Sequence, residues 1–362
     1  MSKLFLPSGY LNMRGIIQDS MEKHHTPFTT ITGARGTGKT YGALDYLYYY
    51  GIKFLYLRRT DAQREISASE DMNPFKILNK DKGYAISTKS LGKYMDGYYE
   101  TTEDVDSKGR SITVYGKCVG YVAALTTFSN IRGISAQDVD VIVFDEFIPE
   151  LHERRFKGEA EALLNLYESI NRNRELNGQP PVYLFCLSNS NDIRSPLFEY
   201  LGIMEKVVRL TEKPKNIHEL VLEDRGIRII HIKESPISKQ KEETALYKMT
   251  KGTQFFNMAI SNNYKMRGKS FVKPVPLIEY IPRAQIEDIV ICVHKSNHTM
   301  YVTSHLYGEP KVITMDKKFL AKEYGFVWNA AVRGFCFFDS YETFTKFTEY
   351  LNVPKDCLEM LN

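Results

Sequence analysis

The feature that most constrains this chain is an eight-residue phosphate-binding loop near its amino terminus. The loop reads Gly33-Ala34-Arg35-Gly36-Thr37-Gly38-Lys39-Thr40, a complete match to the G-x-x-x-x-G-K-[ST] pattern. Residues 28–32 before it are mostly β-branched or aromatic, as in a buried strand. Residues 39–50 after it place apolar side chains at helical spacing, and Gly51 follows as a stop. A strand, a glycine turn and a helix in this order predict a nucleotide-binding unit in an α/β fold.

The residue types in this loop specify its chemistry. The glycines allow successive backbone N–H groups to point at phosphate oxygens, and the positive end of the following helix strengthens the attraction. We expect Lys39 to reach the β and γ phosphates of ATP, and the Thr40 hydroxyl to bind Mg²⁺. All eight loop residues are therefore predicted to contact the nucleotide.

A second motif offers a metal ligand and a base. Residues 141–144 form a continuous apolar run, typical of a parallel strand buried on both faces, and Asp145 and Glu146 follow directly. Ligands bind at the carboxyl ends of strands in open α/β sheets. We expect Asp145 to hold Mg²⁺ opposite Thr40. Glu146 is predicted to polarise the attacking water, because an acid added after the metal ligand favours a hydrolase over a switch.

Two further segments contain candidates with open alternatives. Asn189 follows the hydrophobic residues 182–187. It could sense the γ phosphate or orient water, or it could be a plain turn residue. Residues 163–175 form an amphipathic helical pattern whose end contains Arg172 and Arg174. These arginines could complement the helix dipole, or one could face the nucleotide of a neighbouring subunit as an arginine finger.

Taken in order, these segments resemble one protein family. Six segments recur in the DNA-encapsidation ATPases of small tailed phages of the phi-twenty-nine type: residues 33–40, 58–59, 143–147, 163–166, 172–175 and 186–189. The resemblance implies a ring-forming P-loop ATPase of the ASCE type, related to large terminases, which drives double-stranded DNA into a preformed capsid. By position, it implies these roles: Asp145 as the metal-holding acid, Glu146 as the catalytic base, Arg172 as the trans-acting finger with Arg174 as the nearby alternative, and Asn189 as the sensor.

The same resemblance implies the partners and the place of action. They are ATP and Mg²⁺, double-stranded DNA, the capsid portal and a homo-oligomeric ring, with a pentamer as the expected ring. The protein is expected in the host cell cytoplasm and transiently on the portal vertex. The sequence leaves open whether a scaffold RNA bridges motor and portal.

Composition agrees with a protein that binds nucleic acid only in places. The net charge is just +4, and Lys and Arg clearly outnumber Asp and Glu only in residues 201–265, by 12 to 8. This excess indicates a solvated helical face or a surface for nucleic acid or the portal. The five cysteines are widely spaced, which favours a reducing compartment without a zinc site. No apolar run approaches the roughly 20 residues of a membrane span.

The pattern of elements predicts three regions. Residues 1–200 are expected to form the P-loop ATPase domain, a three-layer α/β domain with a parallel sheet. Inside it, residues 84–122 indicate short strands around a hairpin turn, an inserted β element whose basic side chains could line a DNA channel. Residues 201–265 are expected to form a helical linker region, and residues 266–362 a small α/β domain.

The resemblance implies that this last domain is RNase H-like, as in large terminases that cut DNA with metal-binding carboxylates. The strands expected at residues 289–294 and 300–304 contain no acid, and Glu287 and Asp288 precede the first of them. We therefore expect a non-catalytic domain. The alternatives are a large-terminase-like ATPase that cleaves DNA, a nucleotide-switched DNA-binding module, and a conjugation or segregation ATPase.

Overall fold

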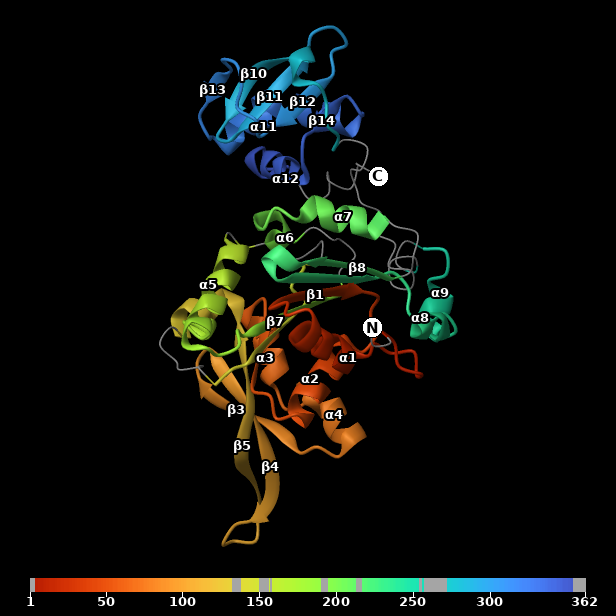
Figure 1. The fold of residues 1–362 in the computed structure, drawn as a ribbon, viewed down its shortest axis with the longest axis vertical. Coiled ribbons are helices and arrows are strands. Elements are labelled where there is room, and N and C mark those ends of the chain that lie inside the picture. Colours follow the sequence, from red (N-terminus) through yellow and green to blue (C-terminus); the bar gives the residue numbers. More distant parts are fainter. Residues whose placement is uncertain are drawn as a thin grey trace. The chain divides into compact units, whose positions relative to one another are not determined.

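The computed structural model describes residues 4–131, 138–149, 156, 158–189, 195–212, 217–253, 256 and 272–353. Spatial clustering divides the chain into two compact units (Figure 1). Unit 1 contains Met1–Leu197 and Arg209–Tyr264, and unit 2 contains Phe198–Val208 and Lys265–Asn362. Within the described residues no helix is both long and apolar enough to cross a membrane.

Unit 1 is built on a nine-stranded sheet with the order β3-β4-β5-β2-β6-β7-β1-β9-β8. From β5 to β9 in this order every neighbouring pair is parallel, whereas the pairs at the two edges are antiparallel. The strands are β1 Phe28–Gly33, β2 Phe54–Arg58, β3 Ile86–Gly92, β4 Met95–Val105, β5 Ser111–Ala124, β6 Val141–Asp145, β7 Tyr183–Ser188, β8 Ile217–Leu222 and β9 Ile227–Ile232. The carboxyl ends of the parallel strands therefore lie together along one side of the sheet, called the carboxyl edge below.

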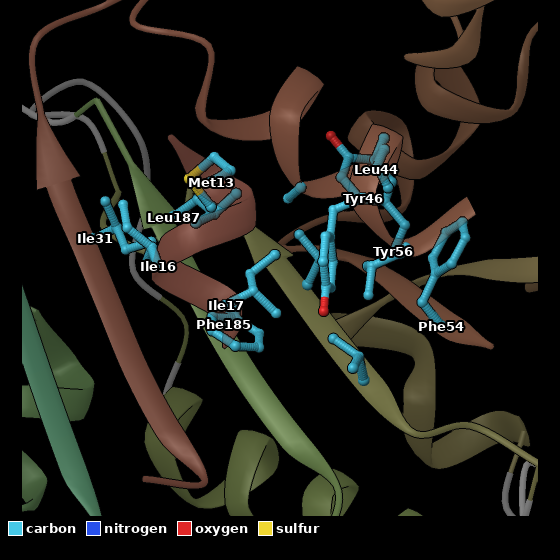
Figure 2. Packing of buried hydrophobic residues seen from close by; sticks show 14 of the residues in the cluster. Met13, Ile16, Ile17, Ile31, Leu44, Tyr46, Phe54, Tyr56, Phe185 and Leu187 are labelled. Carbon is cyan, nitrogen blue, oxygen red and sulfur yellow. The ribbon is translucent and has the colours of Figure 1, made fainter. Parts of the chain in front are cut away.

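Helices cover both faces of this sheet. The helical elements of this unit are α1 Met13–Gln18, η1 Asp19–Lys23, α2 Lys39–Tyr49, α3 Asp61–Ala68, α4 Phe75–Lys82, η2 Leu125–Ile131, α5 Glu159–Asn171, η3 Glu175–Asn177, η4 Glu223–Arg225, α8 Pro236–Lys241 and α9 Ala245–Met249. Two further helices, α6 Pro196–Tyr200 and α7 Met204–Glu212, have residues in both units. Buried side chains of α1, α2 and α4 pack on alternate residues of the strands, and Figure 2 shows Ile16 of α1 beside Ile31 of β1. On the other face, the Tyr167 ring of α5 packs on Phe28 with centroids 4.8 Å apart. The predicted three-layer α/β arrangement is confirmed.

The elements around both nucleotide motifs agree with the sequence. β1 ends at Gly33, α2 begins at Lys39, and β6 ends at Asp145. β7 lies between β1 and β6, and β2 lies on the other side of β6. The loop after β1 and the acids after β6 therefore share the carboxyl edge of the sheet.

Residues 217–232 differ from the expected helical linker, because they form β8 and β9 at the edge of the large sheet. β9 pairs in parallel with β1 from Phe28↔Ile227 to Gly33↔Ile232, and all six of its residues are buried. Two polar residues within the strand, Arg228 and His231, obscure its apolar pattern in the sequence. Arg228 can be buried because its Nε lies 2.7 Å from Glu219 Oε1 on β8.

The inserted β element is also longer than the short strands predicted. β4 and β5 form a hairpin that projects from unit 1 (Figure 1) and closes around Asp106–Arg110. The inner half of β5 pairs with β2, from Phe54↔Gly120 to Arg58↔Ala124, so it belongs to the main sheet. Its outer half pairs only with β4, and residues 111–117 are exposed on both faces.

Unit 2 has a five-stranded sheet with the order β13-β10-β11-β12-β14. Its elements are η5 Leu277–Glu279, β10 Tyr280–Ile286, β11 Ile289–His294, β12 Met300–Thr303, β13 Lys311–Ile313, α11 Lys317–Val332, β14 Cys336–Phe338 and α12 Tyr341–Tyr350. Trp328 of α11 and Phe344 of α12 pack into the core of this sheet. The two strands predicted here are confirmed, while the RNase H-like relationship stays a prediction.

Candidate nucleotide-binding and hydrolysis site

The phosphate loop is held in place by its own backbone and by the segment that precedes α1. Gly36 and Gly38 have φ angles of 64° and 86°, a left-handed conformation that glycine adopts without steric cost. The Leu11 N–H donates to the Thr37 carbonyl at 2.9 Å, and the Thr37 hydroxyl donates to the Ala34 carbonyl at 3.2 Å. These bonds shape the loop without using the backbone N–H groups that face a phosphate.

The Lys39 ammonium lies inside the loop. Its Nζ donates to the Gly33 carbonyl at 3.2 Å and to the Ala34 carbonyl at 2.9 Å, and the residue is only 5% exposed. Burial lowers the pKa of Lys39 to about 7, although the nearby Asp145 carboxylate acts in the opposite direction. A bound phosphate would restore the charged form, because an anion at this distance favours the ammonium.

Asp145 joins the acidic motif to the loop. Its Oδ2 accepts hydrogen bonds from the Thr40 hydroxyl at 2.8 Å and from the Tyr56 hydroxyl at 2.7 Å. The Asp145 carboxylate is buried, and hydroxyl and carboxylate oxygens are the donors that Mg²⁺ prefers. This pair of side chains therefore fits the ion, and Thr40 and Asp145 would hold it.

Glu146 stands apart from Asp145 because the backbone turns sharply after β6. Its φ of 55° is left-handed, a conformation that non-glycine residues seldom adopt and that concentrates at functional sites. Arg58, the last residue of β2, places its Nη2 2.6 Å from Glu146 Oε2 and its Nη1 3.4 Å from Asp145 Oδ2. Burial alone would lower the pKa of Arg58, but Tyr56, Asp145 and Glu146 outweigh it and raise the pKa.

The next residue, Arg59, points to a different partner. Its Nε and Nη2 lie 2.7 and 2.9 Å from the two carboxylate oxygens of Glu159, the first residue of α5. Both side chains are buried. Arg58 therefore contacts Glu146 beside the loop, whereas the next residue, Arg59, contacts the start of α5.

The carboxyl end of α5 lies near the amino ends of the parallel strands, opposite the carboxyl edge. Arg174 Nη1 is 3.1 Å from Asp140 Oδ1, and Asp140 directly precedes β6. Arg172 follows α5 and is exposed, with its Nε 3.3 Å from the Ser169 carbonyl. A five-residue strand is about 16 Å long, so Arg172 lies too far from the phosphate loop of its own chain to touch a nucleotide there.

Asn189 lies at the same edge as the loop. It directly follows β7, whose Ser188 pairs with Thr32 of β1 and whose Leu187 pairs with Asp145 of β6. Asn189 is partly exposed between the ends of these two strands. This position suits either role that the sequence leaves open.

The sequence alone assigns no role at this site to three side chains. Tyr56 and Arg58 lie two residues apart on β2, and only the pairing of β2 with β6 shows that they contact Asp145 and Glu146. Polar residues at the end of a hydrophobic strand are the signal that could have found them. Lys241 of α8 donates from its Nζ to the Arg35 carbonyl of the loop, and no sequence pattern connects these two residues.

Comparisons with known proteins agree with this geometry. The family model described as podovirus DNA encapsidation protein (Gp16) matches residues 18–319. The DNA packaging proteins of Bacillus phages B103 and phi29 are 25% and 26% identical to this chain over 251 residues, which are 67% of it. The matched parts are 66% and 64% of those two proteins, so the chain spans slightly less than two thirds of the length of these curated relatives.

Two solved structures are similar in fold. The Phi-28 gp11 DNA packaging motor has a TM-score of 0.59 at 17% identity, covering 96% of this chain and 99% of its own. The bacteriophage Phi-29 viral genome packaging motor assembly has a TM-score of 0.57 at 18% identity, covering 99% and 100%. At these identities the likeness shows the fold.

Proposed function

The chain belongs to the podovirus DNA encapsidation family, and from this premise we propose that it is an ATP-hydrolysing motor. In this proposal, identical subunits form a ring that moves double-stranded viral DNA through the portal into a preformed capsid. The protein works in the host cytoplasm and binds the portal vertex while packaging proceeds.

The observation that carries the proposal is the convergence of two motifs 105 residues apart. The Thr40 hydroxyl and the Asp145 carboxylate are hydrogen-bonded at 2.8 Å, with Lys39 buried in the adjacent loop. Glu146 lies beside them with a side chain that is 43% exposed, so water can reach it. A metal-holding pair, a phosphate-binding lysine and a carboxylate that water can reach together suit hydrolysis of a nucleoside triphosphate.

Each residue has a distinct task in this reaction. Lys39 neutralises phosphate charge, and the loop N–H groups hold the phosphates in line for attack. Glu146 accepts a proton from the attacking water. Arg58 positions Glu146, because its guanidinium fixes the carboxylate at 2.6 Å. When bound, Mg²⁺ neutralises charge on the phosphate oxygens.

The arginine finger of this proposal is Arg172 of an adjacent subunit. Arg172 lies at the end of the strands opposite its own loop. Within the residues that the structure describes, its exposed guanidinium donates only to the Ser169 carbonyl. Arg174 is held by Asp140. Arg172 is therefore the better placed of the two to reach a neighbouring nucleotide, and hydrolysis requires the ring.

The proposal is tested by measuring the ATPase rate of the full-length protein alone, with double-stranded DNA, and with DNA and empty capsids. We expect the rate to rise with each addition, and Lys39→Ala to abolish nucleotide binding. A rate that is the same in all three conditions would show that hydrolysis is not coupled to DNA and portal, and would favour a nucleotide-switched module.

A further inference from the structure

The strongest unexplained feature outside the two motifs is a second lysine on the phosphate loop. Lys241 is the last residue of α8, and its ammonium donates to the Arg35 carbonyl. The next residue, Gly36, passes directly beneath this ammonium, because a Cβ built on Gly36 would collide with Lys241 Nζ. Lys241 therefore lies within van der Waals contact of the loop backbone.

The fold fixes the position of α8 beside the loop. β9 runs parallel to β1 up to the pair Gly33↔Ile232, so the chain after β9 leaves the sheet at the point where the loop begins. Ile237 of α8 is buried, and a Cβ on Gly9 would lie 3.1 Å from the Ile237 nitrogen. α8 is thus packed against the same amino-terminal segment whose Leu11 donates to the loop.

The two lysines approach the same part of the loop. Lys39 Nζ donates to the carbonyls of Gly33 and Ala34, and Lys241 Nζ donates to the carbonyl of Arg35. In a loop of this pattern the backbone N–H groups toward the helix hold the α and β phosphates, whereas the lysine reaches the β and γ phosphates. Lys241 therefore stands at the end of the loop where the γ phosphate binds.

The charges around Lys241 also indicate an anionic ligand. In the part of the chain that the structure describes, no carboxylate forms an ion pair with Lys241, whereas Lys248 of the neighbouring α9 pairs with Glu243 at 3.1 Å. Burial lowers the pKa of Lys241. Two ammonium groups that contact one loop repel each other, and an anion bound between them would offset this repulsion.

We propose that Lys241 is a second phosphate-binding lysine that contacts the γ phosphate and so makes the site prefer a nucleoside triphosphate to a diphosphate. This inference rests on the proposed ATPase function. It assigns part of the basic excess of residues 201–265 to the nucleotide instead of DNA. It also connects α8 directly to the presence or absence of the γ phosphate.

The test compares the affinities of the DNA-free, full-length protein for ATPγS and ADP, each with Mg²⁺, by competition with a fluorescent nucleotide. Lys241→Met keeps the aliphatic stem and removes the charge. A charge-assisted hydrogen bond to phosphate is lost only for ATPγS, so its affinity should fall about tenfold while ADP affinity stays within about twofold. Lys241→Arg should keep most of the preference, and Lys248→Met is the matched control that should bind both nucleotides normally.

An equal loss of ATPγS and ADP affinity in Lys241→Met would overturn the inference, because Lys241 would then only hold the loop in shape. Unchanged affinity for both nucleotides would overturn it as well. Lys39→Ala separates this failure from failure of the proposed function. If Lys39→Ala abolishes binding while Lys241→Met has no selective effect, only the role of Lys241 is wrong. If the wild-type protein binds neither nucleotide, both proposals are wrong.

Discussion

Each of the two units contains a buried hydrophobic strand in the interior of its sheet. Comparing these two strands shows which feature of a sheet brings polar side chains together. β6 lies between β2 and β7, and β11 lies between β10 and β12. All five residues of β6 are buried, and so are the first four of β11. The two strands are similarly apolar, so the strands themselves do not distinguish the unit that contains the candidate site from the other unit.

The difference lies in the direction of their neighbours. β6 is parallel to β2 and β7, so the polar groups that end these strands meet at one edge and Arg58 reaches Glu146. β11 is antiparallel to both of its neighbours, so adjacent strands end at opposite edges. At its end, His294 Nε2 lies 3.4 Å from Glu279 Oε2. Parallel neighbours thus concentrate functional groups, whereas antiparallel neighbours disperse them.

The strongest test of this comparison concerns Arg172, which lies near the amino ends of the parallel strands, away from the phosphate loop. Arg172 is placed there, so it cannot serve its own site, and a trans-acting finger contributes about 10³–10⁵ in rate. Arg172→Ala should lose turnover by this factor while ATP affinity changes little, because the finger acts on the transition state. Turnover and nucleotide affinity of purified rings on capsids provide the measurement, and Arg174→Ala is the control with a smaller loss.

Mixing two inactive proteins shows whether the arginine acts between subunits. Arg172→Ala and Glu146→Gln each supply what the other lacks, so mixed rings contain some interfaces with both groups intact. Partial recovery of activity is expected. If mixed rings form but remain inactive, Arg172 is not a trans-acting finger, and Arg174 becomes the residue to test.

The second test replaces one acid beside each of the two strands. Glu146→Gln at the end of β6 should retain ATP binding and lower turnover about 10²–10⁴-fold, the usual contribution of a general base. Glu287→Gln at the turn before β11 should leave turnover unchanged, because Glu287 is exposed in unit 2. Steady-state ATPase assays of both variants are sufficient. Near-normal turnover of Glu146→Gln would remove this residue from the mechanism.

The sequence predicts local structure near the motifs well, because each motif is short and continuous. Gly33 through Thr40, the strand before them and the run ending at Asp145 define their own strand, loop and helix. The sequence does not predict that Arg58 meets Glu146 or that Lys241 meets Arg35. These contacts join residues 88 and 206 positions apart, and they depend on strand order, which no local pattern specifies.

The same limit explains the missed strands. β9 contains Arg228 and His231, and both are buried with polar partners. Arg228 pairs with Glu219 of β8 and also donates to the Ile16 carbonyl and the Ser20 hydroxyl. His231 is hydrogen-bonded to Thr32 of β1. A sequence pattern counts such residues as polar, whereas the fold hides them with their partners. Tertiary context therefore decided the structure of residues 217–232.

The third test concerns the buried ion pair between Arg59 and Glu159, which anchors the start of α5 to the end of β2. Glu159→Gln leaves the Arg59 guanidinium buried beside an uncharged amide, and breaking a buried pair on one side typically costs about 3–5 kcal/mol. We expect a loss of this size in the free energy of unfolding measured by urea denaturation. The double variant Arg59→Met with Glu159→Leu should recover most of the stability, because it leaves no unpaired buried charge. A single variant as stable as the wild type would show that the pair does not anchor α5.

The smallest expected effect belongs to Asp288, the other acid before β11. Lys346 Nζ lies 2.6 Å from Asp288 Oδ2, and the Tyr350 hydroxyl donates to Asp288 Oδ1 at 2.8 Å. Partial burial acts to raise the pKa of Asp288, but these two contacts outweigh it and lower the pKa. Because the folded pKa lies below the unfolded value of about 3.9, the stabilisation is present above that pH and is lost as the pH falls through the folded pKa.

Asp288→Asn should therefore reduce stability at pH 7 by only about 0.2–1 kcal/mol, as for other exposed ion pairs, and the difference from wild type should vanish in acid. The same assignment predicts no nuclease activity: plasmid DNA incubated with the full-length protein and Mg²⁺ or Mn²⁺ should stay intact. Lys346 and Tyr350 of α12 bind both oxygens of the Asp288 carboxylate, so we expect Asp288 to serve the structure of unit 2 and not to bind a metal. Cleavage that disappears in Asp288→Asn or Glu287→Gln would contradict this, and would show that an antiparallel sheet edge in this protein does form a catalytic site.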